Sequence, residues 1–454
     1  MPGPTEERLH AAIRLLPAID AHTHLVGGRL SAAGLHDILL YHMAVSDLYA
    51  AGCPSGARLT QYPGRPTDEE AHARLAEAVP YLPLVVNTGI SWGVRIILGE
   101  LYGWTKPVTP DNWRELDALV RLRSEDPAWP AEVQRRAGIV RFGTEYARRE
   151  GFADRDRLFY SLEWAFFTRC QWGEYDTALY ELERCWGRSP DSPAPIGGGS
   201  RPATERTVRC VADVLAAVDH YVAAMPLDCI VSMATHISTD LDLRVVSDEE
   251  MAAALQRRPQ AGPAERDIYA SYVNEAFLAA LERLPRPPVF QFSFGAEPLP
   301  FETAGRLSQR SIAQLAEMVS RRPGLRFQCF LASRHSNQSL CTLCRELPNL
   351  SLAGYWWHNF FASSIGQIME ERLEMLPINK QIGFFSDAYC IEWAYAKSRM
   401  VRQIMAGVLA RKVEQGVWSE ADALGFAAAM LLDTPRTLLG LAETGEPVGL
   451  RGPA

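Results

Sequence analysis

The stretch Ala18-Ile19-Asp20-Ala21-His22-Thr23-His24-Leu25 decides how the whole chain is interpreted. Apolar residues at 15–19 lead directly into two histidines that are separated by one residue. In a β-strand successive side chains point to opposite faces, so His22 and His24 would share one face. Two imidazoles on one face at the end of a strand can bind one divalent metal ion. The alternative is a chance pair of surface histidines, but the apolar lead-in favours a metal site.

Length and composition limit the classes of protein that this chain can belong to. It has 454 residues, of which 47% are hydrophobic, and a net charge of −8. This acidic balance argues against a protein that binds nucleic acid or a membrane surface. The N-terminus lacks the apolar core of a signal peptide, and no stretch reaches the ~20 apolar residues that span a bilayer. We therefore expect a cytoplasmic protein with a small-molecule partner, and reduced thiols for its nine cysteines.

Eight short apolar runs, separated by segments with helical spacing, indicate the fold class. Alternating strands and helices predict a parallel sheet, and eight such units predict a closed (β/α)8 TIM barrel of ~250 residues with insertions. The runs are the opening stretch and residues 138–144, 157–162, 227–235, 288–295, 325–332, 350–356 and 381–387.

The spacing between the first two runs is too long for an ordinary barrel connection. Residues 1–30 are expected to hold the first barrel strand and its lead-in. Residues 31–135 are mostly helical in pattern and are interpreted as a helical insertion that covers the barrel mouth. Residues 136–454 would form the remainder of the barrel and the C-terminal helices.

The polar residues at the ends of the runs are the candidates for chemistry, because the active site of such a barrel lies at the C-terminal ends of its strands. Asp387 follows Phe384-Phe385-Ser386, so its carboxylate would lie against an apolar wall, where a metal or a cation offsets the cost of burial. Its alternative role is the N-cap of the next helix. His236 is either a site residue or a core histidine, and Arg334 either binds an anion bidentately or is an ordinary surface arginine.

These strand ends together resemble the uronate isomerase family of the amidohydrolase superfamily, along nearly the whole chain. Residues 19–25 are similar to the family's Phe-Asp-Tyr-His-Cys-His-Leu, and residues 383–389 are similar to its Gly-Met-Leu-Thr-Asp-Ser-Arg. Gly354-Tyr355-Trp356-Trp357-His358-Asn359 resembles its Gly-Ser-Gly-Trp-Trp-Phe-Asn. The paired tryptophans and the final aspartate segment are the most specific parts of the match.

The resemblance implies a homo-oligomeric enzyme that interconverts an aldo- and a keto-hexuronate by moving a proton between C1 and C2. It implies a divalent metal, with zinc as the expected ion, held by His22, His24 and Asp387. The catalytic candidates are Asp387, His236 and Arg334 at positions that match the family, together with Tyr389, which departs from the family pattern. The substrate-binding residues would be His42, Trp356, Trp357 and Asn359.

The chain departs from the family pattern where the substrate would be held. Met43-Ala44-Val45-Ser46 stands in place of the family's Tyr-Lys-Trp-Arg, Ser293 in place of a histidine, and Tyr389 in place of an arginine. A phenol is neutral, whereas arginine is always charged, so carboxylate binding at that position should weaken. The candidate metal ligands thus match the family pattern, whereas several positions that would hold the substrate differ from it.

Three functional hypotheses follow from this pattern. The first is an isomerase acting on a sugar acid or related polyol, with Tyr389, Asp387 or His236 as the acid–base group. The second is a hydrolase in which a metal lowers the pKa of a water that attacks an ester, amide or lactone, and Asp387 takes the proton. The third is a binding module without catalysis, which three retained metal ligands disfavour.

Overall fold

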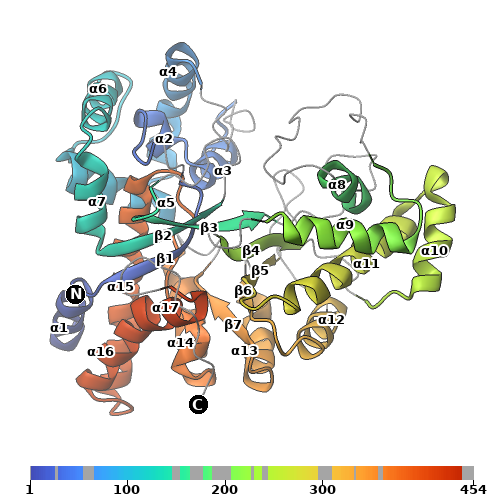
Figure 1. The fold of residues 1–454 in the computed structure, drawn as a ribbon. Coiled ribbons are helices and arrows are strands. Elements are labelled where there is room, and N and C mark those ends of the chain that lie inside the picture. The colour runs from blue at the N-terminus through green and yellow to red at the C-terminus, as the bar shows by residue number, and fades with distance from the viewer. Residues whose placement is uncertain are drawn as a thin grey trace.

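The strands form a single eight-stranded parallel sheet in which each strand pairs with the next along the chain (Figure 1). The predicted (β/α)8 barrel is thereby confirmed. In chain order the strands are β1 (Ala18–Thr23), β2 (Ile139–Glu145), β3 (Leu158–Glu163), β4 (Ile230–Ile237), β5 (Val289–Phe294), β6 (Phe327–Leu331), β7 (Leu350–Ala353) and β8 (Gln381–Ile382). This computed structural model describes residues 2–25, 29–54, 66–145, 154–163, 177–186, 206–225, 230–237, 244–294, 309–331, 334–355 and 361–441.

The segment after β8 returns to the first strand. The backbone N–H of Asp387 donates to the carbonyl of His22, and that of His24 donates to the carbonyl of Ala388, both at 2.9 Å. An apolar cluster inside the sheet joins β1, β3 and β5, no two of which pair with one another, and its members include Ile19, Phe159, Val289, Phe330 and Phe385. Only the interior of a barrel brings β1, β3, β5 and β6 together in this way.

Strand β1 changes its register between Asp20 and Thr23, the interval that contains His22. Asp20 pairs with Phe142 and Thr23 pairs with Thr144, so β1 has one more residue than β2 between these two pairs. Such a bulge re-aims the side chains that follow it. Ile19 belongs to the inner cluster, and the His22 ring also meets that cluster, lying 5.3 Å from the Phe330 ring. The bulge thus explains how an odd-numbered and an even-numbered residue of β1 face the same interior.

Strands β7 and β8 are shorter than the apolar runs predicted. After Ala353 the chain turns at Gly354, whose φ is +49°, and Arg372 donates to the Gly354 carbonyl at 2.6 Å. After Ile382 the N–H of Gly383 donates to Met430 instead of continuing the ladder. The residues between Gly383 and Asp387 therefore do not continue the strand, and they lead to the candidate site.

A set of helices stands between β1 and β2, in the interval where the sequence indicates an insertion (Figure 1, blue to cyan). Several of them pack on one another, with α2 in contact with α4 and α6, and α3 in contact with α5. The helices are α2 (Leu35–Leu39), α3 (His42–Ala50), α4 (Asp68–Ala78), η2 (Val79–Leu84), α5 (Gly89–Ile96), η3 (Ile97–Leu101), α6 (Trp113–Ser124) and α7 (Trp129–Ala137).

Helix α15 (Ile391–Glu414) connects this helical region to the barrel, because it packs against α1 (Pro4–Ile13), α5, α7 and α14 (Ala362–Met375). At its first turn Glu392 accepts hydrogen bonds from Ala32, Tyr102 and Trp129. The other helices in the described ranges are α8 (Thr177–Cys185), α9 (Val211–Ala223), α10 (Asp248–Gln256), η5 (Arg258–Gln260), α11 (Pro263–Glu282), α12 (Gln309–Ser320), η6 (Arg334–Ser336), α13 (Asn337–Glu346), η8 (Ile378–Lys380), α16 (Glu420–Ala428), η9 (Ala429–Asp433) and α17 (Thr434–Leu439).

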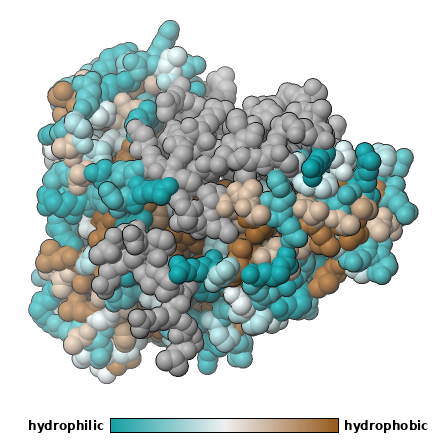
Figure 2. Space-filling model, viewed as in Figure 1, coloured by the Kyte–Doolittle hydropathy of each residue, from teal (hydrophilic) through white to brown (hydrophobic). Residues whose placement is uncertain are grey.

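Apolar residues on the face drawn in Figure 2 occur in small groups among hydrophilic side chains. Within the described ranges no single helix has the length and hydropathy to cross a membrane. The helical segments Asp68–Leu84 and Gly89–Leu101 reach that length and hydropathy only when taken together, and they are bent by 114° at the break between them. The described cysteines are free, and all except Cys210 are buried.

Candidate metal centre

Three side chains from the two ends of the chain converge beside the barrel interior. His24 Nε2 lies 3.2 Å and His22 Nε2 lies 3.5 Å from Asp387 Oδ1. One ligand atom from each residue fits within 4.8 Å of the others. The three side chains are only 3%, 11% and 8% exposed for His22, His24 and Asp387. The pair of histidines and the distant aspartate that the sequence singled out are thus neighbours in space.

His42, the first residue of α3, approaches the other oxygen of the same carboxylate. Its Nε2 lies 3.7 Å from Asp387 Oδ2. The two oxygens of Asp387 therefore face different partners: Oδ1 faces the His22 and His24 pair, and Oδ2 faces His42.

Asp387 has an unusual backbone conformation. Its φ is +58°, in the left-handed region that a non-glycine residue occupies at a cost of about 1 kcal/mol or more. Its N–H donates to the His22 carbonyl at 2.9 Å, and its own carbonyl accepts from the Tyr41 hydroxyl at 2.6 Å. Asp387 is not a helix cap, because α15 begins at Ile391 with Cys390 in the N-cap position.

The surroundings keep the Asp387 carboxyl ionised and the His42 imidazole neutral. Burial opposes ionisation of Asp387, yet the His22 and His24 imidazoles beside it hold the pKa of this carboxyl well below its usual range. Burial lowers the pKa of His42 to about 3, although the Asp387 carboxylate favours its charged form. The centre thus pairs a carboxylate with a neutral imidazole near pH 7.

Aromatic rings flank the two candidate histidine ligands. Tyr389 stacks on His24 with ring centroids 4.5 Å apart and planes 16° apart. The ring of His22 meets Phe330 at 5.3 Å and Phe385 at 5.8 Å. These contacts restrict the orientations of the two imidazoles.

The residues present fit a divalent cation. His22 Nε2 is buried and has no hydrogen-bond partner among the described residues, an arrangement that is costly for an imidazole nitrogen unless something else binds it. Two imidazole nitrogens and one carboxylate oxygen form a donor set that suits zinc and other borderline divalent ions.

The other residues predicted from the sequence have different outcomes. His236 lies on β4 opposite Ser293 of β5, but its side chain is outside the described part of the structure, as are Trp356, Trp357 and Asn359. Arg334 is exposed, and its Nη1 donates to Gln367 at 2.7 Å. The described contacts of Arg334 thus lead to α14 and not to the metal ligands.

Three buried residues that the sequence did not single out surround the Asp387 backbone. Asp20 accepts from the N–H of Ser386 at 2.8 Å, while Lys397 donates to the Ser386 carbonyl and to the Tyr41 hydroxyl. Burial raises the pKa of Asp20 to about 7 and lowers that of Lys397 to about 7. The one available signal was a lysine on the apolar stripe of the helix that follows Asp387, four residues after Trp393.

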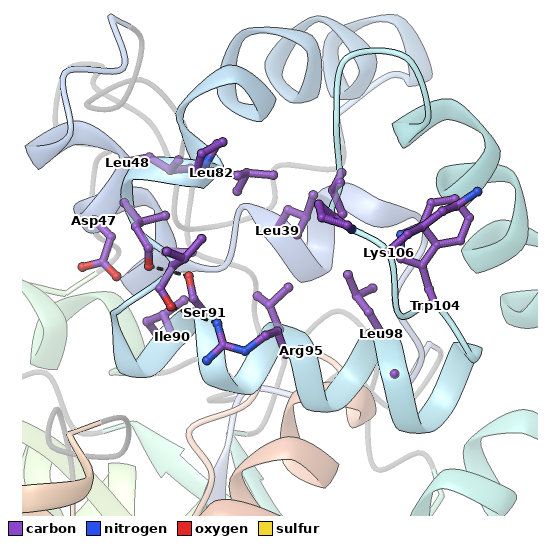
Figure 3. Close-up of a pocket in the computed structure, with 18 of the residues that line it drawn as sticks. Leu39, Asp47, Leu48, Leu82, Ile90, Ser91, Arg95, Leu98, Trp104 and Lys106 are labelled. Atoms are coloured by element: carbon purple, nitrogen blue, oxygen red, sulfur yellow. Dashed lines mark hydrogen bonds between the residues drawn. The ribbon is translucent and has the colours of Figure 1, made fainter.

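A cavity of about 610 Å³ in the helical region is separate from this centre (Figure 3). Apolar side chains such as Leu48, Ile90 and Leu98 line it, together with Asp47 and Arg95. Helix α3 lies between the two sites: His42 faces Asp387, and Leu48 lines the cavity from another side of the same helix. None of the three candidate metal ligands lines the cavity.

No family model and no curated protein matches the sequence. Solved structures do resemble the fold. A uronate isomerase from Thermotoga maritima has a TM-score of 0.75 at 12% identity, with 97% of this chain and 98% of that chain covered. A glucuronate isomerase from Caulobacter crescentus gives 0.73 at 15%, with 96% and 93% covered. A uronate isomerase from Bacillus halodurans C-125 gives 0.67 at 17%, with 97% and 98% covered. Over nearly its whole length, the chain has the fold of the uronate isomerases.

Proposed function

We propose that this protein is a metal-dependent isomerase that interconverts the aldose and ketose forms of a hexuronate or a related sugar acid. The observation that carries the proposal is the convergence of His22, His24 and Asp387 within 4.8 Å beside the barrel interior. The shared fold with uronate isomerases supports the reaction class.

His22, His24 and Asp387 would hold the divalent ion, with zinc as the expected metal. When bound, such an ion polarises a carbonyl and stabilises the negative charge that develops on its oxygen. Tyr389 stacks on one face of the His24 ring, and Phe330 and Phe385 pack around the His22 ring, so both imidazoles are preorganised for this task.

Aldose–ketose isomerisation moves one proton between C2 and C1 and another between the two oxygens, with no net change in atoms. Asp387 Oδ2 and His42 Nε2 lie 3.7 Å apart and offer a carboxylate beside a neutral imidazole. We assign the acceptance and return of the carbon-bound proton to Asp387, and a hydrogen bond to a substrate oxygen to His42. His236 and Arg334 stay sequence-based predictions of catalytic residues, and Tyr389 stays the alternative acid–base group. Trp356, Trp357 and Asn359 stay predicted substrate contacts.

Proton exchange followed by NMR tests this proposal and separates it from hydrolysis of an ester, amide or lactone. Zinc-loaded protein is incubated in D2O with glucuronate or galacturonate. We expect the wild-type protein to form the ketose and, at the same time, to incorporate deuterium into the substrate. Asp387→Asn should show neither ketose formation nor deuterium incorporation. Neither exchange nor conversion with either sugar acid, in protein that retains its metal, would contradict the proposal.

A further inference from the structure

Hydrogen bonds from three separate elements meet at the short segment Ser386–Ala388. Asp20 of β1 accepts from the Ser386 N–H at 2.8 Å. Lys397 of α15 donates to the Ser386 carbonyl. Tyr41, which directly precedes α3, donates from its hydroxyl to the Asp387 carbonyl at 2.6 Å. Each peptide group next to the Asp387 side chain is thereby tied to a different part of the fold.

Lys397 connects two of these attachments. Its ammonium also donates to the Tyr41 hydroxyl at 2.9 Å, and the side chain is fully buried. The Tyr41 hydroxyl therefore accepts from Lys397 and donates to Asp387, which forms a continuous chain of hydrogen bonds from α15 to the Asp387 backbone. Such chains gain strength in a low-dielectric interior.

The conformation of Asp387 explains why these attachments matter. A left-handed φ of +58° at a non-glycine residue persists only where the surroundings impose it. If the segment relaxed to an ordinary conformation, the Cα–Cβ bond would point elsewhere, and the carboxylate would leave His22 and His24. The direction of a metal ligand thus depends on contacts made by its backbone.

We propose that Lys397 and Tyr41 are positioning residues for the metal centre: they hold the left-handed Asp387 backbone so that its carboxylate faces the histidine pair. This inference rests on the metal site of the proposed function. Neither side chain is a metal ligand, and both act through Asp387. Partners of this kind typically contribute about 10- to 100-fold to metal affinity.

A purely structural role is the competing explanation, and α15 supplies a matched control. Arg402 is also a buried cation on this helix, and it also donates to backbone carbonyls, those of Ile13 and Gly138. Neither carbonyl belongs to the Ser386–Ala388 segment. Arg402→Met should lower the melting temperature without changing the metal affinity of the folded protein.

The test measures cobalt and zinc binding to metal-free protein by competition with a chelator, below the melting temperature of each variant. We expect Lys397→Met to weaken binding by about 10- to 100-fold and Tyr41→Phe by about 10-fold. The visible absorption bands of bound Co²⁺ should change in both variants, because ligand geometry determines these bands. Arg402→Met should keep the wild-type affinity and spectrum.

Each outcome decides between the explanations without reference to any substrate. Wild-type affinity and an unchanged cobalt spectrum in Tyr41→Phe and Lys397→Met would overturn the positioning role and leave the proposed function standing. If Lys397→Met does not fold, Tyr41→Phe decides alone, because it removes a single oxygen. If the wild-type protein binds neither ion, the proposed function and this inference both fail.

Discussion

At the scale of single residues, the two oxygens of Asp387 face different partners. Oδ1 faces the histidine pair at 3.2 and 3.5 Å, while Oδ2 faces His42 at 3.7 Å. A carboxylate held in this way can bind a metal with one oxygen and exchange a proton with the other. The left-handed backbone at Asp387 and the hydrogen bond from Tyr41 make this double orientation possible.

Tyr389 occupies the position where the uronate isomerase pattern has an arginine, and here its ring stacks on His24. We predict that Tyr389→Phe keeps this stack, the metal affinity and turnover to within a few-fold. Tyr389→Ala should weaken metal binding by about 10-fold, because the His24 ring loses its support. Metal titration and initial rates check both variants. A loss of turnover of about 100-fold or more in Tyr389→Phe would instead make the hydroxyl an acid–base group.

Gly354 lets Phe385 approach the backbone just ahead of the metal centre. A Cβ at this position would lie 2.0 Å from Phe385 Cδ1, and the φ of +49° is unfavourable for alanine. Gly354→Ala should therefore lower the free energy of unfolding by about 2–4 kcal/mol, as urea denaturation measures it. Gly416 is a matched control, with φ of +72° and no heavy atom within 4 Å of its Cβ. Gly416→Ala should cost only about 1 kcal/mol, and equal losses in the two variants would exclude the steric effect.

At the scale of elements, α15 organises the region around the site. Its first turn carries Glu392, which binds the residue Ala32 after β1 and two aromatic residues of the helical region. Its second turn carries Lys397, which reaches the Asp387 segment. The same helix thus fixes the helical region to the barrel and binds the carbonyl of the residue just before a candidate metal ligand.

The buried carboxyl of Glu392 gives this arrangement a pH dependence. Burial raises the pKa of Glu392 above the usual carboxyl value, although hydrogen bonds from Trp129, Ala32 and Tyr102 oppose the shift. The titratable groups beside it include the Tyr102 phenol and the Cys390 thiol. Because the folded state keeps the proton to higher pH than the unfolded chain does, stability falls as pH rises from about 4.5 to the raised folded-state pKa.

Urea denaturation of wild type and Glu392→Gln across this pH range checks the sign. The free energy of unfolding of wild type, minus that of the variant, should decrease with rising pH and level off above the folded-state pKa. An increase of this difference with pH would mean that the three donors stabilise the ionised carboxylate more than burial opposes it.

At the scale of the whole molecule, much of the barrel was predictable because its strands are continuous apolar runs. Parallel strands buried on both faces leave this signal in the sequence. The ends of β7 and β8 were not predictable, since the Gly354 carbonyl accepts from Arg372 and the Gly383 N–H donates to the Met430 carbonyl, both of which lie outside the two strands. The bulge in β1 is equally invisible, because it depends on the pairing with β2.

The candidate metal ligands were predictable from the sequence, but the residues that hold the Asp387 backbone in place were not. Two histidines at alternate positions and an aspartate after an apolar run carry a recognisable pattern. Asp20, Tyr41 and Lys397 act through the backbone of Ser386 and Asp387, and hydrogen bonds of this kind have no sequence spacing of their own. The separation of the apolar cavity from the metal centre by α3 likewise depends on tertiary packing.

Metal content provides the most direct test of the centre. Protein purified or reconstituted with zinc is examined by elemental analysis and by titration, together with His22→Ala, Asp387→Asn and the control His72→Ala, which removes a histidine that instead binds Asp117 at 2.8 Å. We expect a stoichiometric divalent ion in wild type and in His72→Ala, and its loss in His22→Ala and Asp387→Asn. A wild-type protein that binds no divalent ion, or an undiminished ion in both site variants, would contradict a metal centre at His22, His24 and Asp387.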